Sequence, residues 1–443
     1  MKINTSPISG TQELTPEVQA SFDILKTKIK DSYLKHGYLN IETPSIERTD
    51  ILLAKAGGDT EKQIYKVVKT AESELEADQA LRFDHTVPLA RYVVEHENDL
   101  IFPFKVAQSG LNFRGERAQK GRFREFYQCD IDVIGRDSLP IAYDADVIST
   151  LLDTFASFNL STPVLARISN RKILSGFLEA LGLDKLTKEI SGIIDHAEKV
   201  TPEKTKMDLE ELKINKTDVK KILDFIELKG NRSLIIAELN NLEVDNETFK
   251  NGVYELDQVL YLLESVGLGE QVEGDMKIIR GLDYYTGTVF EFILPEYKNI
   301  GSVCGGGRYE NLAGFFSKKS FPGVGGSIGL TRLFYVLEEK QLFSFDYQSL
   351  LDFAVIPVSE SEFDEAFNVA RRLRDKNYSA TVILIDKKLG DKMGYASKLA
   401  KKGIVIGEEE IGATSLNAKN FTTGEIEELN IEVVSNPEDF WAD

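Results

Sequence analysis

Residues 104–135 read FKVAQSGLNFRGERAQKGRFREFYQCDIDVIG, which is two strand-like runs joined by a charged loop at 115–121. The second run, 122–135, alternates in polarity, as a strand with two different faces does. One face carries Phe123, Tyr127, Cys129, Ile131 and Val133, and the other carries Arg124, Gln128, Asp130 and Asp132. Water normally covers such a polar face, and Asp132 could be an ordinary solvated residue. The density of hydrogen-bonding groups also fits a face that binds a ligand.

Further elements surround this hairpin on both sides of the chain. Apolar residues at helical spacing, together with runs rich in strand-forming residues, predict the elements. We expect helices at 15–36, 145–157 and 171–182, a strand interrupted by Pro44 within 38–47, a strand over 276–294, a glycine run at 304–312, and a glycine-rich strand leading into a helix over 324–339. Residues 183–250 are rich in Lys, Glu, Asp and Leu, and we interpret them as a helical insertion.

The pattern changes after about residue 350. Strand-like runs at 352–358, 379–385 and 403–407 alternate with helical runs near 361–376 and 388–402, which predicts a small α/β domain. The segment SFDYQSL (344–350) is interpreted as the linker before it. A chain of 443 residues exceeds one ordinary core, so this division is expected.

The composition excludes several classes of protein. At 42% hydrophobic and 28% charged residues, the chain is typical of a globular protein. It shows neither a signal peptide nor an apolar run of membrane-spanning length, so we expect a cytoplasmic protein with no membrane contact. Two cysteines, Cys129 and Cys304, are too few for a disulfide framework or a structural zinc site. The net charge of −19 argues against general affinity for nucleic acid, so any phosphate binding must come from local basic clusters.

Three arginines are candidates for phosphate binding. Arg114 ends the first run of the hairpin, Arg280 opens the stretch RGLDYYTG (280–287), and Arg332 follows Gly329 at the start of a predicted helix. The planar guanidinium suits phosphate oxygens, and a helix N-terminus adds backbone donors. Taken singly, each arginine could equally form a surface ion pair. The sequence has no Walker motif and no dinucleotide-binding glycine pattern, so a nucleotide site would be of another kind.

The carboxylates Asp84 and Asp132 are candidates for binding an ammonium or an imidazole N–H. The four histidines lack metal spacing, and His85 is interpreted as a packing residue. No serine or cysteine nucleophile is supported. An enzyme of this kind would act by positioning and charge stabilisation, as in phosphoryl or nucleotidyl transfer.

Several stretches together resemble histidyl-tRNA synthetase, a class II aminoacyl-tRNA synthetase. TPSIE (43–47), FRGERAQKGRFREFYQCDID (113–132) and GGSIGLTRL (325–333) resemble motifs 1, 2 and 3 of that class. RGLDYYTGTVFE (280–291) resembles the histidine-specific signature and is the most specific of these. KLGDKMGYASKLAKKGIVIGEEEIG (388–412) resembles the anticodon-binding domain, so the likeness covers nearly the whole chain.

The resemblance implies a role for each candidate. Histidine would be bound by Asp84, Thr86, Gln128, Asp132, Tyr284 and Tyr285; ATP by Arg114, Arg280 and Arg332, of which Arg114 and Arg280 are catalytic; and the tRNA acceptor end by Arg117 and Gln119. ATP would be a substrate with Mg²⁺ bridging its phosphates, and no metal would be held by protein ligands alone. Asp84 and Asp132 stand where some family members carry glutamate, so the pocket would differ by a methylene.

The implied fold is α+β: a class II antiparallel sheet flanked by helices over 1–345, interrupted by the helical insertion at about 183–250, and a C-terminal α/β anticodon-binding domain over 346–443. The implied partners are L-histidine, tRNA(His) and a second copy of the chain in a homodimer. Basic residues gather at the hairpin (Arg114, Arg117, Lys120, Arg122, Arg124) and on the C-terminal domain (Lys387, Lys388, Lys392, Lys398, Lys401, Lys402). The lysines could also be a solvated helix face. The alternative function is a non-catalytic, histidine-binding regulatory paralogue, although such paralogues typically lack the anticodon domain.

Overall fold

The structure is a computed structural model, and it describes residues 3–54, 61–70, 78–117, 121–279, 285–310, 312–343 and 351–430. The chain divides into two compact units, Met1–Glu13 with Leu25–Phe343 and Leu14–Ile24 with Ser344–Asp443. The predicted domain boundary at 345/346 and the predicted linker fall outside the described residues. No helix in the described ranges combines the length and apolar character needed to cross a membrane.

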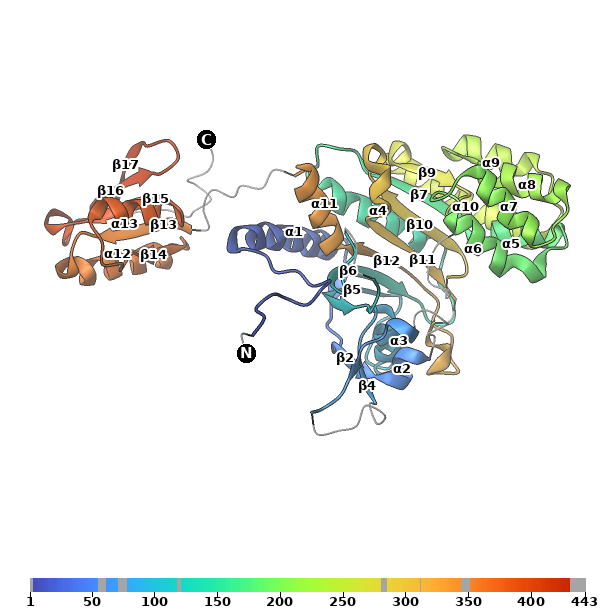
Figure 1. Ribbon diagram of the computed structural model, residues 1–443, viewed down its shortest axis with the longest axis horizontal. Coiled ribbons are helices and arrows are strands. Elements are labelled where there is room, and N and C mark those ends of the chain that lie inside the picture. Colours follow the sequence, from blue (N-terminus) through green and yellow to red (C-terminus); the bar gives the residue numbers. More distant parts are fainter. Residues whose placement is uncertain are drawn as a thin grey trace. The chain divides into compact units, whose positions relative to one another are not determined.

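The first unit is built on a nine-stranded sheet (Figure 1). In spatial order its strands are β1 (Leu39–Asn40), β5 (Phe104–Phe113), β6 (Glu125–Ile134), β12 (Gly323–Gly329), β11 (Cys304–Tyr309), β10 (Thr288–Ile293), β7 (Leu165–Asn170), β9 (Val272–Asp275) and β8 (Lys229–Gly230). The six strands from β5 to β7 pair antiparallel, as the sequence predicts. Parallel pairs β1–β5 and β7–β9 extend this core on either side, so the whole sheet is mixed.

Helices α4 (Ala142–Ala156) and α11 (Leu330–Lys340) pack on strands β6 and β12. The phenyl ring of Phe155 in α4 stacks on that of Phe292 in β10, with centroids 5.5 Å apart. The last turns of α1 (Pro16–Lys35) also reach the sheet, where the Tyr33 hydroxyl donates to the Cys129 carbonyl at 3.0 Å. The apolar face of β6 is therefore buried from Cys129 to Val133, and Tyr127 before it is half-buried.

A small three-stranded sheet lies beside the main one. Its order is β2 (Ile46–Arg48), β4 (Gln79–Leu81) and β3 (Lys66–Val67), with α2 (Thr49–Leu53) and α3 (Thr86–Glu95) beside it. Pro44 separates β1 from β2, which confirms the predicted interruption. Hydrogen bonds from the Arg82 side chain to the carbonyls of Thr43 (2.7 Å) and Leu111 (2.8 Å) join this region to β5.

The helical insertion gathers at the β9–β8 end of the sheet (Figure 1). It contains α6 (Thr187–His196), α7 (Pro202–Glu211), α8 (Lys216–Ile226) and α9 (Arg232–Asn241), between α5 (Arg171–Ala180) and α10 (Glu247–Ser265). The helical stretch therefore continues to Ser265, beyond the predicted end near 250. Side-chain caps begin α5, α7, α8, α9 and α10; the capping residues are Asn170, Thr201, Asn215, Asn231 and Asn246.

The predicted strand at 276–294 is only partly correct. β9 ends at Asp275, residues 276–279 are not extended, and β10 begins at Thr288. Two hydrogen bonds explain the early end of β9. The Asp275 side chain accepts from the backbone N of Lys277 at 2.9 Å, and the backbone N of Ile278 donates to the Asp275 carbonyl at 3.2 Å. These bonds close a turn in place of a ladder.

The second unit holds a five-stranded sheet in the order β14 (Ala380–Val382), β13 (Leu351–Pro357), β15 (Ala400–Ile406), β16 (Ser415–Asn420) and β17 (Ile426–Asn430). Helix α12 (Phe363–Asp375) confirms the helix predicted near 361–376. The helix predicted at 388–402 is wrong in its second half: α13 covers Leu389–Ala396, and Ala400 opens β15. Because β15 lies between β13 and β16, its backbone bonds on both sides, which outweighs the local helical preference.

Candidate active site

Glycines of β11 and β12 leave space for polar side chains over the middle of the sheet. A Cβ atom at Gly325 would lie 2.0 Å from Oδ1 of Asp132, which stands opposite it in β6. A Cβ at Gly307 would lie 2.9 Å from the ring of Tyr285, and one at Gly323 would lie 2.4 Å from the ring of Tyr309. These glycines therefore clear the space that the side chains of Asp132, Tyr285 and Tyr309 occupy.

Asp132 is buried against these glycines and is not the solvated strand residue that the sequence left possible. Only 4% of it is exposed, and its Oδ1 accepts a hydrogen bond from the Tyr309 hydroxyl at 3.0 Å. Burial and the neighbouring charge of Asp130 hold the pKa of Asp132 well above its ordinary value. A carboxylate kept from water in this way favours a partner that brings an N–H donor or a positive charge.

Asp84 is a second buried carboxylate, and it lies close enough to Asp132 for its charge to act on it. Its Oδ1 accepts from the backbone N of Val87 at 3.0 Å, across the first turn of α3, where Thr86 is the first residue. Burial raises the pKa of Asp84, and the bond from Val87 and the charge of Arg114 oppose that rise. The charges of Asp84 and Asp130 both raise the pKa of Asp132, so three carboxylates lie together in one buried region.

Arg114, Gln128 and Arg332 line one cleft of about 340 Å³. The guanidinium carbon of Arg114 stands 4.4 Å from the ring centre of Phe83 and 4.9 Å from that of Phe126, and its Nε donates to the Phe83 carbonyl at 3.3 Å. Two rings and a carbonyl fix this cation before any ligand arrives. The other lining residues are Glu116, Gly121, Arg122, Phe123, Phe126, Ser302, Val303, Cys304, Gly305, Ser327 and Gly329.

Arg332 projects into the cleft from the first turn of α11, directly after strand β12 ends at Gly329. Its Nη2 donates to the Ile300 carbonyl. The preceding residue, Thr331, accepts a hydrogen bond from the backbone N of Tyr127 at 2.7 Å, which ties the helix start to β6. The cleft thus has a fixed cation at each of two walls, a geometry suited to a polyphosphate.

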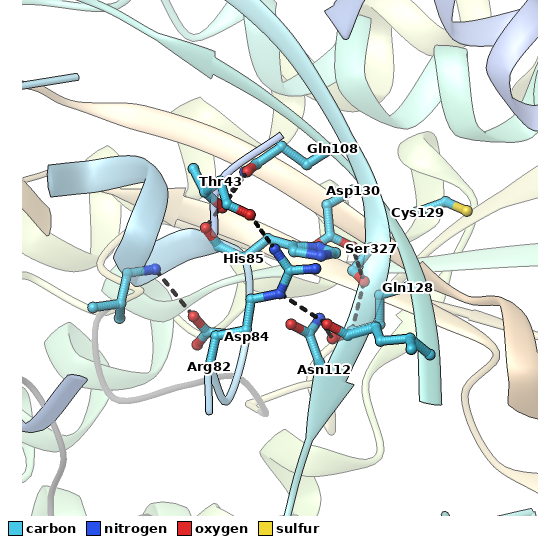
Figure 2. Close-up of polar contacts among 12 residues, drawn as sticks. Thr43, Arg82, Asp84, His85, Gln108, Asn112, Gln128, Cys129, Asp130 and Ser327 are labelled. Carbon is cyan, nitrogen blue, oxygen red and sulfur yellow. Dashed lines mark hydrogen bonds and ion pairs between the residues drawn. The ribbon is translucent and has the colours of Figure 1, made fainter. Parts of the chain in front are cut away.

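Gln128 belongs to a chain of side-chain hydrogen bonds that runs from the cleft into the core (Figure 2). Asn112 Nδ2 donates to Gln128 Oε1 at 2.6 Å, and Gln128 Nε2 donates to the Ser327 hydroxyl at 2.7 Å. Ser327 donates in turn to Asp130 Oδ1, and His85 Nδ1 contacts Asp130 Oδ2 at 3.0 Å. His85 is buried, as a packing residue would be, but it is also bonded to a carboxylate.

The comparisons with known proteins agree along the chain. Residues 10–333 match a family model described as histidyl-tRNA synthetase, and residues 352–436 match one described as an anticodon binding domain. The chain belongs to the histidyl-tRNA synthetase family. A relative named histidine–tRNA ligase from Clostridium tetani is 43% identical over 433 residues, which is 97% of each chain. The resemblance found in the sequence is confirmed.

Solved structures give the same answer for the fold. The crystal structure of a histidyl-tRNA synthetase from Nostoc sp. PCC 7120 matches with a TM-score of 0.87 at 35% identity, over 98% of both chains. A protein from Bacillus halodurans, described as an ATP phosphoribosyltransferase regulatory subunit/histidyl-tRNA synthetase, matches with a TM-score of 0.75 at 20% identity, over 92% of this chain. At that identity the second likeness shows a shared fold alone. The class II α+β fold is confirmed.

For this histidyl-tRNA synthetase family member, not every predicted site residue can be placed. Arg280, Tyr284 and Gln119 lie outside the described residues. Arg117 is exposed in the hairpin loop. Two of the basic residues predicted near it have internal partners: Arg124 donates to the carbonyls of Ser9 and Glu116, each at 3.1 Å, and Arg122 pairs with Glu116 at 3.6 Å.

Arg171, at the start of α5, was missed by the sequence reasoning. Its guanidinium donates to the carbonyls of Tyr285 at 2.9 Å and Ile279 at 3.3 Å, and its backbone N donates to the Gly287 carbonyl at 2.9 Å. One side chain therefore holds the described residues on either side of 280–284. No sequence pattern pointed to Arg171, because an arginine at the start of a helix is common.

Tyr309, Ser327 and Asn112 were also missed as site residues. Tyr309 lies inside the glycine run 304–312, and Ser327 lies inside GGSIGLTRL (325–333). Both residues were therefore part of a recognised segment, but no role was predicted for either. Asp132, the partner of Tyr309, and Gln128, the partner of Ser327, are about 180 to 200 positions away in the chain, whereas Asn112 lies 16 positions from Gln128 in the same hairpin. Only the strand order β5–β6–β12–β11 brings them together.

Proposed function

We propose that this chain is a histidine–tRNA ligase that activates L-histidine with ATP to histidyl-adenylate and transfers the histidyl group to the 3′ end of tRNA(His). One observation carries the proposal beyond family membership. A cleft with two fixed arginines, Arg114 and Arg332, is built on the same strands, β6 and β12, that hold the buried carboxylates Asp130 and Asp132. That is the arrangement needed to hold a polyphosphate next to an amino acid that carries an ammonium group and an imidazole.

The pocket residues are given these roles. Asp132, oriented by Tyr309, accepts a hydrogen bond from an imidazole nitrogen, and Tyr285 with Tyr284 lines the ring. Asp84, Thr86 and Gln128 hold the α-ammonium group. An amino acid without a ring N–H would leave Asp132 buried and unpaired, so discrimination of roughly 10⁴ is expected without an editing domain.

The arginines act on the phosphates. When the histidine carboxylate attacks the α-phosphorus, negative charge grows on the non-bridging oxygens before pyrophosphate leaves. Arg114 and Arg280 stabilise that charge, and Arg332 binds the γ-phosphate. Because Arg114 is already held between Phe83 and Phe126, it needs little reorganisation during the reaction.

Mg²⁺ is expected to accompany ATP, and its chemistry would be to neutralise charge on the leaving phosphates. Among the residues that the structure describes, no group of three or more His, Cys, Asp or Glu side chains could hold a metal ion. Mg²⁺ at nucleotide sites is commonly held by phosphates and water with one or two carboxylates. We therefore assign no protein cage to it.

The proposed domain roles follow the same reading. Residues 1–345 form the catalytic domain, with the insertion at about 183–250, and 346–443 bind the anticodon. Arg117 and Gln119 read the acceptor end of tRNA(His). The chain acts in the cytoplasm as a homodimer. Exposed Leu39 and Ile46, on either side of Pro44, support a subunit contact there.

The test is charging of bulk tRNA from the source organism by the purified protein, with ATP, Mg²⁺ and labelled histidine, against a panel of other amino acids. Charging with histidine alone is the expected result. A folded protein that binds histidine but neither charges tRNA nor exchanges pyrophosphate into ATP would instead be a regulatory paralogue. The Arg280→Ala variant should abolish pyrophosphate exchange and keep the fold, and near-normal exchange would remove Arg280 from the mechanism.

A further inference from the structure

The hydrogen-bond chain behind the cleft can run in only one direction. Asp130, as a carboxylate, offers only acceptors, so the single Ser327 proton must be donated to it. Ser327 can then only accept from Gln128, which turns the Gln128 amide nitrogen toward Ser327. The Gln128 carbonyl oxygen is left to accept from Asn112 and retains a second lone pair.

The direction of this chain matters for the ligand. An α-ammonium group carries only donors, so it needs an acceptor at Gln128. A reversed amide would present its NH₂ group to the ammonium, which removes a hydrogen bond and sets donor against donor. The charge of Asp130 therefore decides, two bonds away, whether Gln128 can bind an amino group.

His85 fixes the far end of the chain. It is 1% exposed, and its Nδ1 lies 3.0 Å from Asp130 Oδ2. Its other ring nitrogen, Nε2, has no hydrogen-bond partner among the described residues. Only Nδ1 is therefore used, to hold the second oxygen of Asp130 while the first receives Ser327 (Figure 2).

A glycine in β5 provides the space for this histidine. Gly110 stands opposite Gln128, and a Cβ there would lie 3.4 Å from His85 Nε2 and 2.4 Å from Nη2 of Arg82. The imidazole thus lies against the bare backbone of β5, on the face of the sheet that carries the Gln128 and Asp130 side chains. All residues of this hydrogen-bond network come from described strands or, for His85, from the position before α3.

We propose that His85, Asp130 and Ser327 are positioning residues that set the orientation of the Gln128 amide, so that its oxygen receives the α-amino group of histidine. The inference rests on the proposed function, since it takes Gln128 as an amino-group ligand. None of the three residues needs to touch the substrate. Their effect is on the affinity for the amino acid and not on the phosphate chemistry.

The decisive variant is Asp130→Asn, which keeps the shape and reverses the direction. If His85 keeps the Nδ1–H tautomer that bonds the carboxylate, the new amide accepts from His85 with its oxygen and donates to Ser327 with its nitrogen. Ser327 must then donate to Gln128, whose NH₂ turns toward the ligand. Measured by pyrophosphate exchange, the KM for histidine should rise about 10- to 100-fold, while the KM for ATP and kcat at saturating histidine stay within about twofold.

A second substitution should restore binding. In the double variant Gln128→Glu with Asp130→Asn, position 128 has only acceptors and Ser327 is free to donate to it, so the KM for histidine should fall back toward the wild-type value. Gln128→Glu alone would face Ser327 with no proton to offer and should be worse than the double variant. Asp130→Asn should thus raise the KM for histidine in the wild-type background and lower it in the Gln128→Glu background. Residues that merely stabilise the fold are not expected to show such opposite effects.

Two controls separate positioning from packing. Asp137→Asn makes the same charge change at an exposed residue just after β6 and should leave all constants unchanged. His85→Asn keeps a donor where Nδ1 stands and should retain more histidine affinity than His85→Leu. Each variant is first shown to melt cooperatively.

The outcomes are distinct. A wild-type KM for histidine in Asp130→Asn, or a double variant no better than Gln128→Glu alone, overturns the inference and leaves the proposed function intact. Losses spread equally over the KM for histidine, the KM for ATP and kcat show a structural role and also overturn it. A wild-type protein without histidine-dependent exchange overturns the proposed function, and the inference with it.

Discussion

Asp132 shows a conflict between stability and binding at a single residue. Its carboxylate is buried, stands near Asp84 and Asp130, and has a pKa raised well above 3.8 by burial. Between its unfolded and folded pKa values the native state binds more protons than the unfolded chain, so its contribution to stability falls as pH rises through that window. The ionised Asp132 therefore lowers the free energy of unfolding of the ligand-free protein, while it offers an acceptor to a ligand with an N–H donor or a positive charge.

Asp132→Asn should therefore stabilise the protein and inactivate it. The amide oxygen can still accept from Tyr309, while the buried charge is gone. Above the raised pKa we expect a gain on the order of 1 to 3 kcal/mol in the free energy of unfolding, shrinking toward zero near pH 4. Urea unfolding at several pH values would measure the gain, and pyrophosphate exchange would measure the loss.

Wild-type stability at pH 7 together with normal histidine activation in Asp132→Asn would contradict this account. A stability gain that does not shrink at low pH would show that the charge is not its cause. Histidine binding by the wild type should also strengthen as pH rises through the raised pKa of Asp132, because the ionised form is the acceptor that the ligand needs.

At the scale of elements, the glycines of β11 and β12 lower the stability of their strands but leave space for the side chains of Asp132, Tyr285 and Tyr309. Gly325→Ala would place a methyl carbon only 2.0 Å from Oδ1 of Asp132, so the carboxylate would have to move. We expect a loss of about 1 to 3 kcal/mol in the free energy of unfolding and a raised KM for histidine. Thermal unfolding and exchange kinetics measure the two effects.

The matched control for Gly325 is Gly192, inside α6, where an added Cβ meets nothing within 4 Å. Gly192→Ala should stabilise its helix by about 0.5 to 1 kcal/mol and leave histidine activation unchanged. Equal behaviour of the two substitutions would show that the glycines of β12 are not there to clear the pocket.

Helix α5 also contributes to the site through its first residue. The Arg171 guanidinium binds the carbonyls of Ile279 and Tyr285 and so fixes the distance between these two residues. Glutamine at position 171 is too short to reach both carbonyls. We expect Arg171→Gln to lower kcat/KM for histidine activation by about 10²-fold through misplacement of Tyr285 and the residues before it. Exchange kinetics under saturating ATP would measure this.

Arg232 at the start of α9 offers the control for Arg171. It also bridges two groups, Asp257 at 2.7 Å and Glu264 at 3.3 Å, but on the insertion surface. Arg232→Gln should cost at most about 1 kcal/mol of stability and no activity. If Arg171→Gln behaves in the same way, the tie has no function in catalysis.

At the scale of the whole molecule, an acidic chain must bind an acidic partner. The six lysines predicted as a basic surface on the C-terminal unit do not all serve it. Lys392 is buried and donates to the carbonyls of Pro357 and Val358, and Lys402 is buried against Glu427. Lys401 lies 3.6 Å from Asp352. The other three lysines of the set are exposed: Lys387, Lys388 and Lys398.

Removing two of these exposed lysines should weaken tRNA binding selectively. In Lys387→Ala with Lys388→Ala, the KM for tRNA should rise, and the slope of log affinity against log salt should fall by about 1.4 to 1.8. Pyrophosphate exchange, which needs no tRNA, is the internal reference. The control pair is Lys376→Ala with Lys419→Ala, also exposed on this unit. Equal losses from both pairs would mean a diffuse charge effect and no local binding surface.

The sequence by itself determined the family, the central hairpin, the glycine-rich strands and the two-part organisation. Each of these features follows from a pattern within a single segment, such as the alternating polarity of 122–135 or the signature at 280–291. A pattern within one segment needs no knowledge of what packs against it, so periodicity and motif spacing predicted it. The end of the predicted helix at 388–402 failed for the opposite reason, because Ala400–Ile406 pairs with two strands that the segment does not contain.

Only the tertiary structure decided how the site is assembled. Asp132 could be solvated or buried until β12 supplied Gly325 opposite it, and His85 was a packing residue until β6 brought Asp130 within hydrogen-bond distance. The direction of the bonds from Asp130 to Gln128 depends on three parts of the protein: strand β6, strand β12 and His85 before α3. Burial turns these contacts from optional into obligatory, because a polar group removed from water must find its partner inside the protein.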